Sequence, residues 1–417
     1  MTQESALRFG AQADEVTSLL RIVNLVRTGG AHTRPEIGRV TGLGRGVVAQ
    51  RVDAGIAMGF LEDGEFGPSS GGRAPRTLRF RAEQGVILVC ALGALHIRVG
   101  LAHLDGRIIA SDHRLWDIAR GPVETLDLAV SLLDGLLTAA GHPAVWAVTV
   151  GVPGPVDFEN GAPVAPPIMP GWNGFDVRGR FEECFGAPTW VDNDVNLLAL
   201  AERSRRDDDA IDLIYCKVGS GVGAGLVSRG RIHRGANGAA GDIGHVRVAD
   251  SATLCRCGKR GCLEAEAGGW AIVRDAELAL PDTPSSISRS GTAISPETVA
   301  VAAMNGDPLA VSLVQRSARL VGESIATLVN VFNPSVIVIG GAVSAAGEIF
   351  LAEVRQRVYG LSLPLATRDL LITRAHGDER EPLRGGAQLA IEQLFDVTFP
   401  RWFSAGRPTL ERIAQVA

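Results

Sequence analysis

Three of the six cysteines, Cys255, Cys257 and Cys262, lie close enough together in the sequence to bind one metal ion. The first twenty residues show no apolar leader, so we expect a cytoplasmic, reducing compartment, where clustered thiols favour a metal site over disulfides. Gly258 and Gly261 allow the loop to fold back on itself. Zinc prefers four tetrahedral nitrogen or sulfur ligands, so the spacing predicts a zinc site. The alternative is three free thiols in a mobile loop.

A second group of candidate binding residues follows the apolar segments that alternate along the chain. Asn193 and Asp194 come directly after one such segment, and the glycine-rich stretch 219–225 belongs to another. An amide beside a carboxylate can donate to one sugar hydroxyl and accept from its neighbour. The alternative is a capped turn before a helix. Alternating strands and helices predict an α/β core with its binding site at the strand ends.

Two motifs of this core resemble the signature of the ROK family, which contains repressors, open reading frames of unknown role and sugar kinases. The first is GANGAAGDIGH at residues 235–245, and the second is CRCGKRGCLE at residues 255–264. The resemblance extends over nearly the whole chain. It implies a two-lobed, actin-like (ribonuclease-H-like) ATPase fold, and it implies His245 as the fourth ligand of a structural zinc.

The same resemblance implies a sugar site beside the zinc. In the family, the histidine ligand and the glutamate two residues after the last cysteine lie beside the sugar, and here these are His245 and Glu264. The family's Asn-Asp pair, whose aspartate binds sugar hydroxyls and serves kinases as the general base, is matched by Asn193 and Asp194. The implied ligand-binding residues are Asn193, Asp194, Asp242, His245 and Glu264.

Two departures from the family pattern bear on the reaction and on the ligand. Kinases of the family carry Asp-x-Gly-Gly-Thr at the first phosphate loop, but this chain has Ala91 and Leu95 at the aspartate and threonine positions. Neither side chain can ligate a cation or hydrogen-bond a phosphate oxygen, so we expect no kinase activity and no catalytic residue. The glutamate of the family's Gly-Glu-Ile-Gly-His is Asp242 here, which withdraws the carboxylate by roughly 1.5 Å, about one C–C bond.

The first 82 residues carry the pattern of a winged helix-turn-helix. Apolar residues at helical spacing predict a first helix over 16–26, and the capping-box sequence TRPE at 33–36 predicts the start of a second. The sequence TGLG at 41–44 predicts the turn before a third helix. The alternative is a small helical dimerisation domain with a flexible linker.

Four side chains of this head are candidate DNA contacts. Arg45 and Gln50 lie early on the third predicted helix, where they would reach base edges or phosphates in the major groove. Two short strands are predicted, at residues 60–62 and 77–80, and a Gly-Gly-Arg arm lies between them. Arg73 and Arg76 of that arm suit a narrow minor groove, where negative potential is concentrated.

The charge distribution agrees with a DNA-binding head. The chain has a net charge of −5; residues 1–82 contain eleven arginines and eight acidic residues, which gives +3 and leaves −8 for the remainder. A small basic module on an acidic body suits a DNA reader. The apolar stretches have the length of strands and are too short to span a bilayer, so we expect no membrane partner.

We therefore predict a sugar-responsive, DNA-binding regulator, and by resemblance a repressor. Its expected segments are the head (1–82), a first lobe to which C-terminal helices return (83–196), a second lobe with the zinc loop (197–398) and a helical tail (399–417). Residues 408–416 of the tail are expected to form a helix between head and body.

The expected partners are a double-stranded DNA operator, a sugar or sugar phosphate, and further copies of the chain in a homodimer or homotetramer. Two alternatives stay open. One is an active sugar kinase fused to a DNA-binding head, and the other is a ligand-independent regulator whose body serves dimerisation or partner binding.

Overall fold

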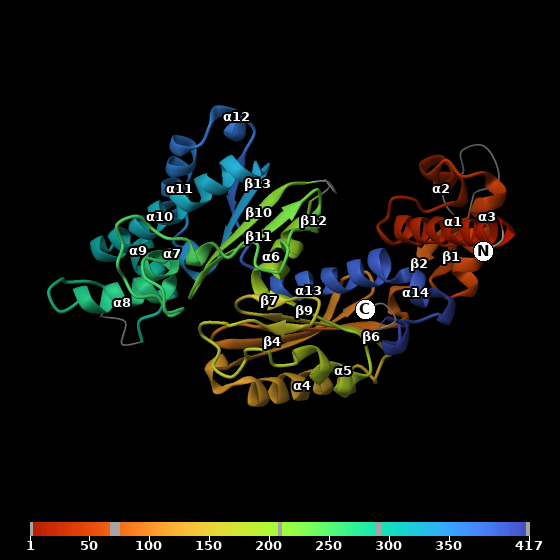
Figure 1. Ribbon diagram of the computed structural model, residues 1–417, viewed down its shortest axis with the longest axis horizontal. Helices are drawn as coiled ribbons and strands as arrows, with labels where there is room; N and C mark the ends of the chain where they lie inside the picture. The colour runs from red at the N-terminus through yellow and green to blue at the C-terminus, as the bar shows by residue number, and fades with distance from the viewer. Residues whose placement is uncertain (1–2, 67–75, 207–210, 288–292, 414–417) are drawn as a thin grey trace.

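The computed structural model describes residues 3–66, 76–206, 211–287 and 293–413 of the chain. Figure 1 shows a helical head at one side and two lobes, each built on its own five-stranded sheet. Among the described residues, no helix is both long enough and apolar enough to cross a lipid bilayer. The predicted class, an α/β body preceded by an α+β head, is confirmed.

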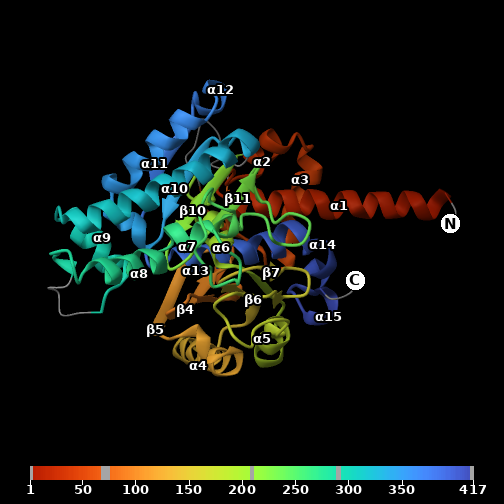
Figure 2. The same ribbon diagram turned by 60° about the vertical axis from the view of Figure 1, so that its left-hand side comes forward.

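The head consists of three helices and a two-stranded wing. Its elements are α1 (Gln3–Arg27), α2 (Arg34–Thr41), α3 (Arg45–Ala57), β1 (Leu61–Phe66) and β2 (Arg76–Phe80). Helix α2 begins at the predicted cap, because Thr33 accepts a hydrogen bond from the Glu36 amide and the Glu36 carboxylate accepts one from the His32 amide at 2.8 Å. It ends at Gly42, whose φ of 73° favours glycine. Figure 2 shows α1 projecting away from the body at its N-terminal end.

The first lobe is built on a sheet with the strand order β5-β4-β3-β6-β9. Its strands are β3 (Val86–Leu92), β4 (His96–His103), β5 (Ile108–Leu115), β6 (Val145–Val152) and β9 (Thr189–Asn193). Strands β3, β6 and β9 run parallel, whereas β4 is antiparallel to both of its neighbours. Every residue of β3 is buried, because α4 (Pro122–Ala139) and α5 (Val177–Phe185) cover one face of the sheet and α13 (Glu381–Ile391) covers the other. A short hairpin, β7 (Val156–Asp157) and β8 (Ala162–Pro163), follows β6.

The second lobe is built on a sheet with the strand order β12-β11-β10-β13-β14. Its strands are β10 (Leu213–Val218), β11 (Val222–Ser228), β12 (Arg231–Ile232), β13 (Val336–Gly340) and β14 (Leu371–Arg374). Strands β10, β13 and β14 run parallel, and β11 is antiparallel to β10. The helices of this lobe are α7 (Leu263–Ala267), α8 (Gly269–Ala279), α9 (Pro296–Met304), α10 (Pro308–Phe332), α11 (Glu348–Leu361) and α12 (Pro364–Thr367).

Helix α6 (Asp194–Arg203) lies between the two lobes (Figure 1), where it contacts β10 and β11 on one side and α13 on the other. Two glycines permit this close packing. A Cβ at Gly225 of β11 would lie 2.6 Å from the Cβ of Ala199, and a Cβ at Gly385 of α13 would lie 1.8 Å from the carbonyl oxygen of Leu197. The N-terminus of α6 is therefore held firmly where the two lobes meet.

An aromatic cluster joins the head to the first lobe. Phe60, which directly precedes β1, packs against Trp146 of β6 and against Phe399 and Trp402 of α14 (Phe399–Trp402), with ring centroids between 5.5 and 6.4 Å apart. These rings belong to one buried core that also includes apolar residues of α1, α3 and α13. The head is thus continuous with the body through a hydrophobic core rather than hanging on a linker.

The C-terminal segment differs from the prediction that residues 408–416 form a helix between head and body. In the structure, α14 and the preceding π-helical turn η6 (Glu392–Val397) contact α1, while α15 (Leu410–Ile413) packs on α14 and contains no buried residue. The aromatic side chains of residues 395–402 bury more apolar area than leucine and isoleucine can offer, so they occupy the junction. Val416 lies outside the described residues.

Candidate functional site

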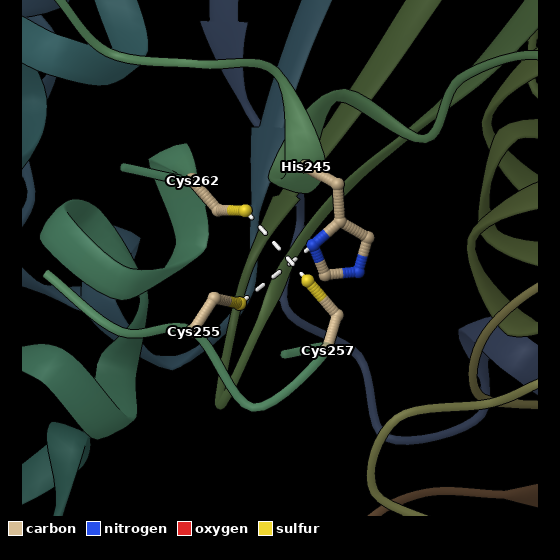
Figure 3. Close-up of side chains that lie close together, drawn as sticks. All are labelled: His245, Cys255, Cys257 and Cys262. Carbon is tan, nitrogen blue, oxygen red and sulfur yellow. Dashed lines mark hydrogen bonds between the residues drawn. The ribbon is translucent and has the colours of Figure 1, made fainter. Parts of the chain in front are cut away.

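Four side chains of the second lobe converge on one point. His245 comes from the short helical turn η3 (Ile243–His245), Cys255 and Cys257 come from the following loop, and Cys262 directly precedes α7. Their ligand atoms all lie within 4.8 Å of one another, and Figure 3 shows the side chains pointing toward a common centre. The Cys257 and Cys262 sulfurs are 3.7 Å apart, and the Cys255 sulfur lies 3.8 Å from His245 Nδ1.

These separations fit a tetrahedral metal site. A zinc ion bound to sulfur at ~2.3 Å would set two of its sulfur ligands roughly 3.8 Å apart. A disulfide would require sulfurs at about 2.05 Å, and none of the three cysteines forms one. The structure therefore brings the predicted ligand set together, and four protein ligands leave a tetrahedral zinc no open position for a substrate.

The loop between the cysteines turns at two glycines, and its thiols differ in acidity: the pKa of Cys257 is lowered, whereas burial raises the pKa values of Cys255 and Cys262. Gly258 and Gly261 have φ values of 85° and 76°, and a Cβ at Gly261 would lie 2.6 Å from the carbonyl oxygen of Ser251. Burial opposes ionisation of Cys257, but the Lys259 amide and the neighbouring cysteines outweigh it and lower the pKa of that thiol. The predicted need for glycine at both turns is met.

An aromatic ring forms one wall of the cysteine cluster. Trp270 of α8 packs against the cluster, with the Arg256 guanidinium 4.7 Å from its ring centroid and the Arg274 guanidinium 5.2 Å from it. Arg256 and Trp270 also line the cavity between the lobes. The cluster and the cavity therefore share a wall.

The cavity between the lobes has a volume of about 120 Å³. Its lining combines the loop after β6, the N-terminus of α6, the glycine-rich residues 220–224 and the segment 238–242. All five side chains predicted to bind a sugar line it: Asn193, Asp194, Asp242, His245 and Glu264. Residues that lie up to 71 positions apart in the sequence are thus gathered in one pocket, as the family resemblance implied.

Asp194 shares this cavity with a basic partner that no sequence motif indicates. Its Oδ2 atom accepts a hydrogen bond from Nζ of Lys217, near the end of β10, and both residues line the cavity. Lys217 lies two residues before the glycine-rich stretch 219–225, and it is one of only two lysines among the chain's 41 basic residues. That rarity was the signal that could have identified it.

Asn193 is engaged by the chain itself. Its Oδ1 accepts a hydrogen bond from the Val195 amide at 2.8 Å, which caps α6, and its Nδ2 donates to the Gly154 carbonyl oxygen at 2.7 Å. The capped turn considered for this pair is therefore present, although Asn193 also lines the cavity. Its amide oxygen and one of its two N–H donors are already used.

Glu264 lies over the glycine-rich loop. Its Oε2 accepts a hydrogen bond from the Val222 amide at 3.2 Å, and a Cβ at Gly221 would lie 2.2 Å from that oxygen. Burial raises the pKa of Glu264, and the Val222 amide only partly offsets the shift. The loop amide that could bind a phosphate oxygen is thus occupied by a carboxylate of the chain.

Asp242 approaches His245 without bonding to it. The closest atoms, Asp242 Oδ1 and His245 Nε2, are 4.0 Å apart, which is too far for a hydrogen bond. Nδ1 of the same ring faces the cysteines, so Nε2 is the atom left for the cavity. A carboxylate bonded to the second ring nitrogen orients a metal-binding histidine, and the shorter aspartate leaves that bond unmade.

The His96 side chain occupies the space beside the first phosphate-type loop. The His96 ring lies against Gly93, where a Cβ would be only 2.3 Å from ring atom Cε1. Burial and the positive charge of neighbouring basic side chains lower the pKa of His96 to about 3, so the ring is neutral at physiological pH. Ala91 is buried in β3, and Leu95 is 63% exposed.

The predicted reading helix presents its polar side chains to solvent. Arg45 and Gln50 are exposed on α3, while Val48 and Val52 are buried against the rest of the head. Helix α3 begins after Gly44, which provides no side-chain cap, so the first amides of the helix have no capping side chain. This face is therefore open to a partner.

The wing arginines are only partly described. Arg76 begins β2, pairs with Asp63 at 3.5 Å and lies 5.6 Å from the centroid of the Phe66 ring. It is thereby held against the wing while its side chain stays 56% exposed. Arg73 lies outside the described residues.

The sequence profile of the ROK family matches residues 88–393, and the chain belongs to that family. A xylose repressor from Caldicellulosiruptor bescii is 27% identical over 384 residues, which cover 89% of this chain and 94% of that protein. A glucokinase from Thermotoga maritima is 30% identical over 282 residues, covering 66% of this chain and 87% of the kinase.

A solved structure shares the same architecture. The crystal structure of a ROK family transcriptional regulator, a homolog of the E. coli MLC protein, has a TM-score of 0.80 and 25% sequence identity. The match covers 92% of this chain and 97% of that one. Regulators thus match more of the chain than the kinase does, although both kinds of relative share the body.

Proposed function

We propose that this protein is a transcription repressor that binds operator DNA through its head, responds to a sugar between its lobes and does not transfer phosphate. The observation that carries the proposal is the single buried core that runs from α1 and α3 through the aromatic cluster into the first lobe. A sugar that favours one arrangement of the lobes would act on the body to which the head is fixed. The extent of the repressor match supports the same function.

In this proposal the cavity is the sugar site. Asp194, Asp242 and Glu264 supply carboxylate oxygens that accept hydrogen bonds from sugar hydroxyls. His245 presents Nε2 beside the sugar, and Asn193 holds the loop after β6 in place while its remaining N–H can reach the ligand. Trp270 provides an apolar wall of the kind common in small-molecule pockets.

We also propose that His245, Cys255, Cys257 and Cys262 bind a structural zinc. The support is the fit of their separations to a tetrahedral site and the presence of four protein ligands. Bound zinc would cross-link the loop and fix the His245 ring, so its effect on the sugar site would be exerted through shape.

A sugar kinase is the second candidate, because a glucokinase is among the relatives and Asp194 occupies the position of the family's general base. Three features oppose it. Ala91 and Leu95 replace the phosphate-loop aspartate and threonine, His96 lies against Gly93, and Lys217 is bonded to Asp194. A coupled ATPase assay with D-glucose and D-xylose tests this candidate, and we expect no ATP turnover above that of the D194N variant.

For the DNA interface we propose Arg45 and Gln50 as major-groove contacts, with Arg73 and Arg76 of the wing in the minor groove. The support is the exposure of the α3 residues and the basic charge of residues 1–82. Two heads in a homodimer, or in a homotetramer of two dimers, would bind two half-sites of an operator.

The proposal is tested in two steps with the full-length protein. Selection from a random duplex library should yield a preferred sequence, whose affinity should fall about tenfold to a hundredfold in Arg45→Ala. The matched control is Arg368→Ala, an exposed arginine of the second lobe, which should bind as the wild type does. Equal affinity of the Arg45 variant would refute the assigned reading helix.

The second step screens D-xylose, D-glucose, N-acetylglucosamine and their phosphates by thermal shift. A ligand at about 100 times its Kd should add about 2.7 kcal/mol of stability. A protein that selects DNA but is stabilised by none of these compounds would favour the ligand-independent regulator instead.

A further inference from the structure

The most unusual charged side chain in the cavity is Lys217. Nearly all of the 41 basic residues of the chain are arginines, and only Lys217 and Lys259 are lysines. Lys217 lies near the end of β10, between Gly223 of β11 and Gly340 of β13 in the sheet register. With no side chain on either neighbour, its stem has a free path across the sheet toward α6.

A further glycine, Gly219, leaves room for the Lys217 side chain. A Cβ at Gly219 would lie 3.3 Å from Cε of Lys217, tighter than most side-chain contacts. Beyond this point Nζ reaches Oδ2 of Asp194, the first residue of α6. A compact ammonium suits this channel, whereas the broad planar head of an arginine requires more space.

The resulting ion pair is only partly saturated. In the described part of the chain, Asp194 Oδ1 has no hydrogen bond of its own, and Nζ of Lys217 bonds only to Asp194. The ammonium has three donors, so two are left over. The Lys217 side chain is 28% exposed and that of Asp194 is 12% exposed, and both line the cavity.

The neighbouring amide cannot supply these donors as well. Asn193 caps α6 through Oδ1 and spends one N–H on Gly154, so it offers a single further donor. As an amide–carboxylate pair for adjacent hydroxyls, Asn193 and Asp194 therefore have one uncharged N–H to offer as donor. Lys217 provides a charged donor next to the same carboxylate.

We propose that Lys217 is a specificity-determining ligand residue, which together with Asp194 grips two adjacent hydroxyls of the sugar: one donates to Asp194 Oδ1 and the other accepts from Lys217 Nζ. This inference rests on the proposed sugar-binding function. The pair recognises a vicinal diol because its acceptor and donor lie side by side. It discriminates against a sugar that lacks either hydroxyl, since the charged group opposite the missing hydroxyl then stays unpaired.

The test measures sugar affinity of the full-length protein by calorimetry. The probe is whichever of D-xylose, D-glucose and N-acetylglucosamine stabilises the wild type, together with its monodeoxy analogues. We expect Lys217→Met to weaken binding of the parent sugar at least tenfold. The matched control is Arg368→Met, which removes an exposed basic side chain of the second lobe outside the cavity and should leave the affinity unchanged.

The deoxy analogues separate direct contact from a structural effect. In the wild type, one analogue should bind at least tenfold more weakly than the parent, and in Lys217→Met this difference should shrink to less than about threefold. Lys217→Gln, which keeps a neutral donor, should lie between the two and serves if the methionine variant does not fold.

Each outcome of this test is decisive. A Lys217→Met protein that binds the parent sugar within about twofold of the wild type, or that retains the full deoxy penalty, would overturn the inference alone. A wild type that binds no sugar of the panel would overturn the proposed function, and the inference with it.

Discussion

The two ends of the interlobe cavity differ in what their side chains can do. The end beside the cysteine cluster carries Asp194, Glu264 and His245, which are polar and face the cavity. At the first phosphate-type loop, which we call the phosphate end and of which Ala94 lines the cavity, Ala91 and Leu95 offer no polar atom. Both ends have nevertheless kept their glycine-rich turns.

This difference shows that the glycines reflect the requirements of the backbone, whereas the polar side chains reflect what the site can bind. Gly241 has a φ of 93°, and a Cβ there would lie 1.9 Å from the carbonyl oxygen of Ala224, so the backbone requires glycine whatever is bound. The space beside Gly93 is occupied by the His96 ring, and the space beside Gly221 is occupied by the Glu264 carboxylate. The glycine pattern therefore records the fold, while the side chains beside it record the chemistry.

The largest expected effect follows from breaking the metal cluster. Cys257→Ser should remove bound zinc, lower the Tm on the order of 10 °C and abolish sugar binding at the same time, because the loop shares a wall with the cavity. Zinc content and thermal unfolding measure this. Cys184→Ser changes an exposed cysteine outside the cluster and should alter neither.

A Cys257→Ser protein with a full complement of zinc and a wild-type Tm would show that the cluster is not a zinc site. It would also remove the proposed reason why the sugar end of the cavity keeps its shape.

The second effect concerns the sugar end alone. Asp194→Asn should weaken binding of the stabilising sugar about tenfold to a hundredfold, because a charged acceptor is lost while the shape is kept. Asp134→Asn, an exposed residue of α4, is the control for loss of one negative charge. Unchanged affinity in Asp194→Asn would show that the sugar lies elsewhere.

A smaller effect should follow from lengthening Asp242. Its carboxylate lines the cavity on a side chain one methylene shorter than glutamate, so Asp242→Glu should bring a carboxylate oxygen closer to the sugar and tighten binding by about two- to tenfold. Calorimetry on the two proteins measures the change. Weaker binding in the variant would mean that the natural ligand needs the space that the shorter side chain leaves.

The smallest effect is expected at the phosphate end. Saturating MgATP should leave the wild-type Tm unchanged, because the His96 ring lies against Gly93 of the first phosphate-type loop and Glu264 already accepts a hydrogen bond from the Val222 amide of the glycine-rich residues 219–225. A clear stabilisation by MgATP would remove the contrast between the two ends and would revive the kinase alternative.

The features that repeat locally were predictable from the sequence. The capping sequence predicted the start of α2, and the alternating apolar segments predicted the strands of the body. Both signals are local, because caps and periodicity act over a few residues. The family motifs gave the gathering of His245 with the three cysteines.

The unpredicted features depend on tertiary packing. Lys217 meets Asp194 only because α6 lies against β10 and β11. The placement of residues 408–416 between head and body was wrong for the same reason: Phe399 and Trp402, at the start of the tail, fill that junction, and no local pattern reports which apolar segment will occupy it.

The most direct test of the account is the DNA affinity of the full-length protein for its selected duplex, measured by fluorescence anisotropy with and without the stabilising sugar. The account predicts that the sugar weakens DNA binding of the wild type at least tenfold and that of Asp194→Asn not at all, since a coupling of 1–3 kcal/mol corresponds to about 5- to 150-fold. A sugar that stabilises the protein yet leaves its DNA affinity unchanged would contradict it.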